Sequence, residues 1–173
     1  MTQRSVEIET ADGTCPAALS IPDGAGPWPA IVMFPDAGGM RDTMREMGGR
    51  LSALGYVVLV PDVYYRNGPY DPIDMRTAFS TKESAEKVMA MIGGYTVDKA
   101  ARDAGAFADF LDTLPEKQAG GIGTTGTATH LAEHSRHQNA LRAIEHRLNT
   151  MPRRSLHWST SHDVYTAAVA MTG

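Results

Sequence analysis

The chain has 173 residues, of which 42% are hydrophobic, 21% charged and 7% aromatic. This length suits a single globular domain, and this composition excludes an intrinsically disordered chain. The net charge is −4, and lysine and arginine form no run, so neither a nucleic-acid partner nor an anionic membrane surface is indicated. We therefore expect a globular domain with an ordinary hydrophobic core.

The signals for cellular location all point the same way. The first residues, MTQRSVEIETADG, hold no apolar stretch of the kind that a signal peptide needs. No window of the sequence approaches the roughly 20 apolar residues of a membrane span. The single cysteine, Cys15, has no partner for an internal disulfide, so nothing points to an oxidising compartment. The sequence therefore predicts a soluble cytoplasmic protein without a membrane partner.

The order of the predicted elements is that of an α/β protein. Residues 5–10 alternate in polarity, and the turn residues of 11–14 separate them from a return strand. Residues 29–34 and 56–60 are short, continuously apolar runs, which is typical of parallel strands covered on both faces. The apolar residues between them have helical spacing, so the pattern predicts a βαβ unit. In chain order we expect strands over 5–10, 15–21 and 29–34, a helix over 41–54, a strand over 56–60, a helix over 81–92, a longer helix capped at Thr96, and a strand over 120–126.

We divide the chain into a core over 1–126 and a divergent helical tail over 127–173. The tail holds all six histidines, and its helical pattern has only a narrow apolar stripe. The tail is either part of the same domain or poorly ordered, and the pattern leaves both open. The core is expected to form a mostly parallel sheet with flanking helices that is incomplete on its C-terminal side.

Three segments of the core, taken together, resemble the dienelactone hydrolase family. They are VEIETADGT in the hairpin, GPWPAIVMFPDAGGMRDTMREMGGRLSALGYVVLVPDVYYRNGPYDP through the βαβ unit, and DAGAFADFLDTLP before the last strand. They stand in the family's order and spacing and cover most of residues 5–126. The resemblance implies an α/β-hydrolase fold and hydrolysis of a small-molecule ester or lactone by a Cys-His-Asp triad, with no cofactor.

The turn FPDAGG over 34–39 matches the family's oxyanion turn. The resemblance gives the backbone N–H of Ala37 a place in the oxyanion hole, where a preorganised donor faces the developing negative charge. Asp36 falls where the family carries an acidic residue beside the nucleophile. A purely structural role is also open, since a strand-to-helix turn favours Asp for capping and Gly for positive φ.

The family's nucleophile motif is absent from its expected place. An α/β-hydrolase carries G-x-nucleophile-x-G on a sharp turn between a strand and a helix. The strand reaches Gly126 on schedule, but Ala128 stands at the nucleophile position and His130 at the closing glycine. Cys15, on the N-terminal hairpin, is expected to be a small buried hydrophobe far from the carboxyl ends of the central strands. We therefore expect this chain to be an impaired or inactive hydrolase.

Residues 127–173 are too few for the helix, strands, acid and histidine loop that the family places after the nucleophile. The string Leu156-His157-Trp158 is similar to the family's histidine loop, so His157 takes the position of the base if the segment between is missing. No triad acid is assigned. The simplest account is a deletion or frameshift in the second half of a complete enzyme, which the coding DNA would settle.

Two arginines in the surface excursion over 62–80 are candidates for substrate binding. In the family this region helps to shape the substrate pocket, and Arg66 or Arg76 would pair with a substrate carboxylate through two parallel hydrogen bonds. A solvent-exposed arginine without such a role is the alternative at either position.

Two further interpretations belong to other functional classes. His130-Leu131-Ala132-Glu133-His134 spells H-x-x-E-H, which on a helix would place His130 and His134 on one face as zinc ligands with Glu133 as base. A solvated, charged helix face is the ordinary explanation, and the main prediction contains no metal. The other interpretation is a non-catalytic relic or binding module, whose open sheet edge would favour homo-oligomerisation.

Overall fold

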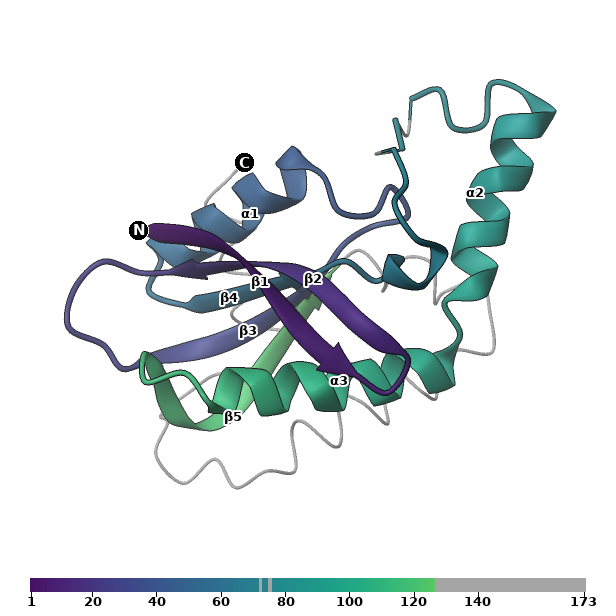
Figure 1. Cartoon of the computed structure of the whole chain (residues 1–173). Helices are drawn as coiled ribbons and strands as arrows, with labels where there is room; N and C mark the ends of the chain where they lie inside the picture. The colour runs from purple at the N-terminus through teal and green to yellow at the C-terminus, as the bar shows by residue number, and fades with distance from the viewer. Residues whose placement is uncertain (72, 75, 127–173) are drawn as a thin grey trace.

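The computed structural model describes residues 1–71, 73–74 and 76–126 (Figure 1). In this part of the chain the strands form one five-stranded sheet in the order β1-β2-β4-β3-β5. The strands are β1 (Thr2–Thr10), β2 (Gly13–Ile21), β3 (Trp28–Phe34), β4 (Val57–Pro61) and β5 (Lys117–Gly126). The helices are α1 (Asp42–Ala53), the 3-10 helix η1 (Tyr65–Asn67), α2 (Lys82–Gly94) and α3 (Val97–Asp112).

The N-terminal hairpin is confirmed. β1 and β2 pair antiparallel from Thr2 opposite Ile21 to Thr10 opposite Gly13. Gly13 has a φ of 128°, a conformation that residues with a side chain rarely adopt, so the turn requires glycine there. β2 also pairs antiparallel with β4, which places the hairpin at one end of the sheet.

The parallel part of the sheet is confirmed as well. β3 pairs parallel with β4 and with β5, and the crossover between β3 and β4 is α1, as the βαβ pattern predicts. Among the described strands only β2 runs against the others, which gives the mostly parallel, mixed sheet of an α/β-hydrolase-like fold. The regular pairing of β3 with β5 ends with Phe34 opposite Gly126, so both strands stop at the same edge of the sheet.

Helices cover both faces of the sheet (Figure 1). On one face, Met44 of α1 packs with residues of β2, β3 and β4 in one buried cluster. On the other face, Phe107 and Leu111 of α3 are fully buried against the same strands. Gly55 follows α1 with a φ of 93°, a conformation that favours glycine directly after the end of a helix. The buried face of α3 matches its predicted spacing. On α1 the match is partial: Met47 and Leu54, which have the same helical spacing as Met44, are exposed, because α1 buries Gly48, Gly49 and Ser52 beside Met44 instead.

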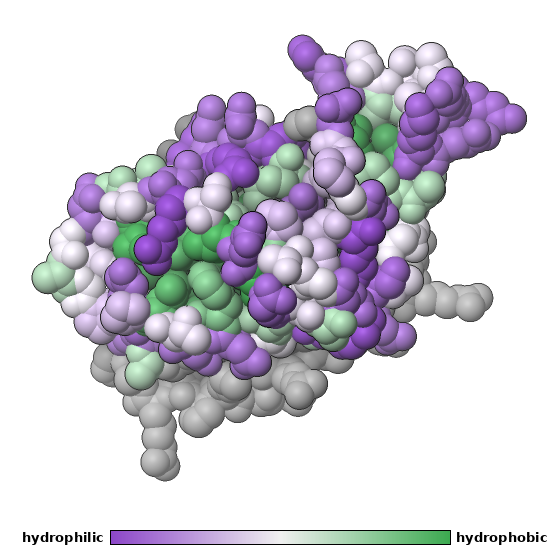
Figure 2. Space-filling view, viewed as in Figure 1, coloured by the Kyte–Doolittle hydropathy of each residue, from purple (hydrophilic) through white to green (hydrophobic). Residues whose placement is uncertain are grey.

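The helix α2 stands away from the sheet, at the end of the molecule where the excursion emerges (Figure 1). Thr81 caps it through a reciprocal pair of hydrogen bonds with Ser84. Val88 of α2 and Ala78 of the preceding segment are buried, and Figure 2 shows hydrophobic residues between α2 and that segment. In the described part of the chain, no helix is both long enough and apolar enough to cross a membrane.

Candidate active site

The candidate site lies at the edge of the sheet where β3 and β5 end. Phe34 is the register partner of Gly126, so the turn after Phe34 begins beside the end of β5. The carboxyl ends of parallel strands are where α/β proteins place their ligands. The predicted oxyanion turn therefore starts beside Gly126, the residue after which the sequence places the predicted nucleophile position.

The turn after β3 is held by hydrogen bonds around Asp36. The Gly39 amide donates to the Asp36 carbonyl at 2.9 Å, and the Gly38 amide donates to Asp36 Oδ1 at 2.9 Å. Gly39 has a φ of 71°, and a Cβ there would lie 2.6 Å from the hydroxyl oxygen of Tyr70. The position therefore requires glycine both for its backbone conformation and for its close contact.

Ala37 lies in this turn, and its backbone N–H makes no hydrogen bond within the described part of the chain. Ala37 is 8% exposed, and no acceptor for its amide occurs among residues 1–71, 73–74 and 76–126. Its carbonyl accepts a hydrogen bond from the Tyr64 hydroxyl at 3.4 Å. A buried amide without an acceptor is uncommon, and such donors are what an oxyanion hole supplies.

Arg41 binds both carboxylate oxygens of Asp36. Arg41 Nη2 donates to Asp36 Oδ2 at 2.6 Å, and Nη1 contacts Oδ1. The side-chain hydrogen bond from Arg41 lowers the pKa of Asp36, and the Gly38 amide adds to this effect. The carboxylate is therefore held ionised and is paired with a cation of the protein, while a catalytic role for Asp36 beside the nucleophile stays a prediction. Sequence reasoning missed Arg41; its position in the first turn after FPDAGG was the only available signal.

Three residues of the excursion that follows β4 pack beside the turn: Asp62, Tyr64 and Tyr70. Tyr70 donates to Asp62 Oδ1 at 2.6 Å and accepts from the Met40 amide at 3.2 Å. The Tyr64 amide donates to the same carboxylate oxygen at 3.1 Å. The rings of Tyr64 and Tyr70 meet edge to face with centroids 6.0 Å apart. Asp62 directly follows a buried strand at its carboxyl end, and this signal could have identified it.

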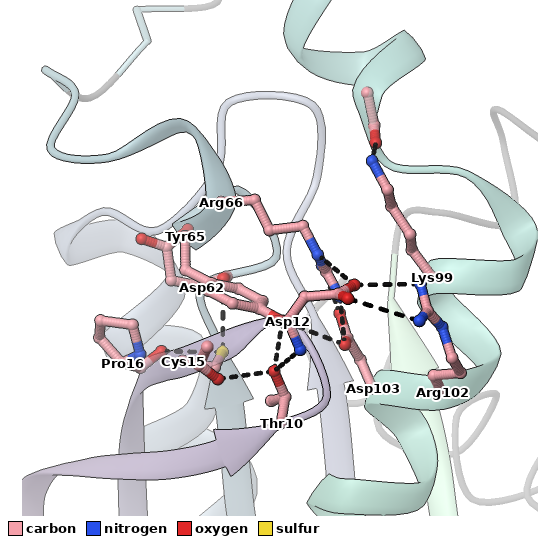
Figure 3. Close-up of polar contacts among 12 residues, drawn as sticks. Thr10, Asp12, Cys15, Pro16, Asp62, Tyr65, Arg66, Lys99, Arg102 and Asp103 are labelled. Atoms are coloured by element: carbon pink, nitrogen blue, oxygen red, sulfur yellow. Dashed lines mark hydrogen bonds and ion pairs between the residues drawn. The ribbon is translucent and has the colours of Figure 1, made fainter.

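Arg66 is bound by two carboxylates of the protein (Figure 3). Its guanidinium donates to both oxygens of Asp103, at 2.8 and 2.6 Å, and its Nε donates to Asp12 Oδ2 at 2.9 Å. Arg102 of α3 also binds Asp12, at 3.0 Å. Arg66 therefore links η1 to the hairpin turn and to α3, while its contact with substrate stays a prediction.

Arg76 has a different environment. Its side chain is 89% exposed and pairs with Asp74 two residues earlier, at 3.1 Å. The pairing partner is itself 45% exposed, so solvent competes with this ion pair. A substrate contact of Arg76 likewise stays a prediction.

Cys15 is buried, as expected, but the expected distance from the strand ends is wrong. Its thiol contacts the carbonyl oxygen of Asp62 at 3.4 Å, directly after β4 ends. The physical reason is that β2 runs antiparallel to β4, with Ala17 opposite Pro61, so β2 begins where β4 ends. Burial raises the pKa of the Cys15 thiol to about 12, which keeps it neutral and unreactive at physiological pH.

The remaining predicted residues lie outside the part of the chain that the structure describes. They are Ala128 at the nucleophile position, His157 at the base position, and His130, Glu133 and His134 of the zinc motif. Within the described ranges, no group of three or more histidine, cysteine or acidic side chains is arranged to hold a metal ion.

A known protein family matches this chain over the segments that form the candidate site. The model of the dienelactone hydrolase family matches residues 15–129, which include the whole turn after β3 and the end of β5. The chain belongs to the dienelactone hydrolase family. A crystal structure of a "Putative Dienelactone Hydrolase" from Klebsiella pneumoniae superimposes with a TM-score of 0.58 at 21% identity, and the match covers 72% of this chain and 49% of that one. This likeness confirms the α/β-hydrolase-like fold.

Two related proteins carry the same name, "Putative carboxymethylenebutenolidase". The protein of Methylorubrum extorquens is 29% identical over 87 residues, which are 50% of this chain and 28% of the relative. The protein of Azospirillum brasilense is 27% identical over 88 residues, which are 51% of this chain and 36% of the relative. The matches thus span about a third of these two family members and about half of the solved structure.

Proposed function

We propose that the edge formed by β3 and β5 is an ester- or lactone-hydrolase site in which the Ala37 N–H is an oxyanion donor. The observation that carries this proposal is the Ala37 amide, buried and without an acceptor in the described part of the chain, in the turn beside Gly126. Membership of a hydrolase family supports it. The relatives' name supports a small cyclic ester as the substrate class.

The proposed chemistry needs a nucleophile two residues beyond Gly126. A thiolate there would add to the ester carbonyl carbon, and the carbonyl oxygen would carry the negative charge toward the Ala37 N–H. A histidine base would first take the thiol proton and would return it to the leaving alcohol oxygen when the carbon–oxygen bond of the ester breaks. Water, deprotonated by the same histidine, would then attack the thioester carbonyl, releasing the acid and restoring the thiol. Ala128 holds the nucleophile position in this sequence, and His157 is our candidate for the base. An alanine side chain cannot attack, so we propose that the chain as it stands is impaired or inactive.

The test is the hydrolysis of p-nitrophenyl acetate by the purified chain, with and without EDTA, against the variant Ala128→Cys. We expect no catalytic turnover by the parent chain and turnover by Ala128→Cys. The control is Glu86→Cys, which puts a thiol on the exposed surface of α2; it should react once with the ester and not turn over.

Two outcomes would contradict the proposal. If Ala128→Cys behaves like Glu86→Cys, a nucleophile at position 128 does not complete a hydrolase site at this edge, and the proposal fails. If the parent chain itself turns over the ester, our proposal that Ala128 leaves the chain impaired or inactive is wrong. Loss of that activity in EDTA would then favour the zinc motif at His130 and His134.

A further inference from the structure

The hydroxyl of Tyr70 joins the ends of two neighbouring parallel strands. It accepts a hydrogen bond from the Met40 amide, in the turn after β3, at 3.2 Å. It donates to Asp62, the first residue after β4, at 2.6 Å. Burial raises the pKa of the Tyr70 phenol, and the bond to Asp62 adds to this, so the hydroxyl keeps the proton that it donates. One oxygen atom therefore ties the turn to the end of β4.

The turn fits closely against the two tyrosine rings. A Cβ on Gly39 would lie 2.6 Å from the Tyr70 hydroxyl oxygen and 3.0 Å from Cδ2 of Tyr64. Tyr64 supports Tyr70 by its edge-to-face contact and donates to the Ala37 carbonyl at 3.4 Å. The carbonyl of Ala37 and the amide of Met40 are thus both bound by tyrosine hydroxyls, while the Ala37 N–H, which precedes both groups in the chain, has no acceptor in the described part of the chain.

We propose that Tyr70 is a positioning residue whose hydroxyl fixes the turn over 36–40 and thereby aims the Ala37 N–H. The inference rests on the proposed function, in which that N–H is the oxyanion donor. It goes further because it assigns a role to a residue of the excursion, which the resemblance to the family treats only as pocket wall. Because Tyr70 belongs to the excursion, a movement of the excursion would displace the turn that carries the Ala37 N–H.

Asp62 and Met40 differ in what they keep when the Tyr70 hydroxyl is removed, and this difference confines the effect of the removal to the turn. Without the Tyr70 hydroxyl, Asp62 still accepts from the Tyr64 amide at 3.1 Å. The Met40 amide, by contrast, loses the one acceptor that it has among the described residues. Loss of the hydroxyl should therefore loosen the turn locally, rather than the sheet.

The experiment compares Tyr70→Phe with Tyr65→Phe. The Tyr65 hydroxyl also makes two side-chain hydrogen bonds, with Thr10 at 2.5 Å and with Asp103 at 3.3 Å, but none with the turn. Both variants lose one phenolic oxygen and should lose similar thermal stability. Amide hydrogen exchange and ¹H–¹⁵N chemical shifts are then measured by NMR on the full chain.

In Tyr70→Phe we expect the Met40 amide to exchange at least about 10-fold faster, because its hydrogen bond is gone. The Ala37 amide resonance should shift. Tyr65→Phe should leave both amides unchanged. The positioning role is overturned if Met40 exchange and the Ala37 shift are the same in Tyr70→Phe as in the parent, or if both variants change them equally.

A second readout uses the Ala128→Cys background. There Tyr70→Phe should lower kcat roughly 10-fold with KM nearly unchanged, because a misaimed donor loses part of the 10²–10³-fold that one oxyanion donor supplies. Tyr65→Phe should leave kcat unchanged. If Ala128→Cys is itself silent, the proposed function has failed, and the NMR comparison alone still decides whether Tyr70 fixes the turn.

Discussion

The guanidinium of Arg66 and the carboxylate of Asp103 form a two-bond ion pair in the interior, with hydrogen bonds of 2.8 and 2.6 Å. Asp103 is 1% exposed and Arg66 is 14% exposed. The pair connects η1, which begins the excursion, to α3, which covers one face of the sheet (Figure 3). The excursion is therefore held near its start by the Arg66–Asp103 ion pair. Further along, the Tyr70 hydroxyl holds it through hydrogen bonds with Met40 and Asp62.

Replacing Arg66 by methionine should destabilise the protein by about 3 kcal/mol, since it leaves the Asp103 carboxylate buried without a cation. The control is Arg102→Met, which removes a half-exposed partner of Asp12 and should cost less than about 1 kcal/mol. Urea unfolding of both variants measures the difference. Equal losses would show that the buried pair with Asp103 adds nothing beyond a surface contact.

Gly39 and Gly105 offer a matched pair of glycine substitutions. Gly39→Ala should cost about 2 kcal/mol or more, because the residue has a φ of 71° and its Cβ would meet the Tyr70 hydroxyl. Gly105→Ala in α3 should raise stability by about 0.5–1 kcal/mol, because nothing lies within 4 Å of the added Cβ and alanine favours a helix. Thermal unfolding of both variants is the measurement. A stabilising Gly39→Ala would mean that the turn does not hold this conformation in solution.

The sheet, the hairpin and the βαβ unit were predictable because their signals are local. Alternation of polarity, short apolar runs and helical spacing each extend over only a few residues. The strand β5 begins at Lys117 rather than at the predicted residue 120, because the Trp28 amide donates a hydrogen bond to the Glu116 carbonyl. No local pattern in the sequence predicts this pairing.

The polar contacts of the site were not predictable in the same way. Arg66 and Asp103 are separated by 37 positions, and Met40 and Tyr70 by 30, so no periodicity connects them. The misplacement of Cys15 has the same origin, since only the antiparallel pairing of β2 with β4 brings it to the end of β4. The oxyanion turn was located only through the resemblance to the family.

The Cys15 thiol should be nearly inert in the folded protein. With its pKa raised to about 12 by burial, roughly 1 in 10,000 molecules carries the thiolate at pH 8, against a sizeable fraction for an ordinary thiol of pKa about 8.5. We expect iodoacetamide to label Cys15 at least about 100-fold more slowly in buffer than in 8 M urea. Rapid labelling of the folded chain would contradict its burial and would reopen Cys15 as a nucleophile.

The ion pair between Asp36 and Arg41 should make stability depend on pH in a predictable direction. The folded-state pKa of Asp36 lies below its unfolded value, chiefly because Arg41 donates to the carboxylate. Such a group contributes stability that is present above the unfolded pKa, about 3.9, and is lost as the pH falls through the folded pKa. The partners are only 21% and 26% exposed, so solvent screens the pair only in part.

Asp36→Asn isolates this contribution, because asparagine still offers an oxygen to the Gly38 amide but carries no charge for Arg41. We expect the variant to be about 1–2 kcal/mol less stable than the parent at pH 7. The difference should shrink as the pH falls below about 4, because the unfolded parent then binds a proton at Asp36 that the folded parent, whose carboxylate is paired with Arg41, binds only at lower pH. The control is Asp74→Asn, whose carboxylate pairs with Arg76 in solvent and should change stability less. Urea unfolding from pH 3 to pH 7 measures all three chains. A difference that stays constant with pH would show that Asp36 supports the turn through its hydrogen bonds alone, and that the charge of Arg41 does not hold the proposed oxyanion turn.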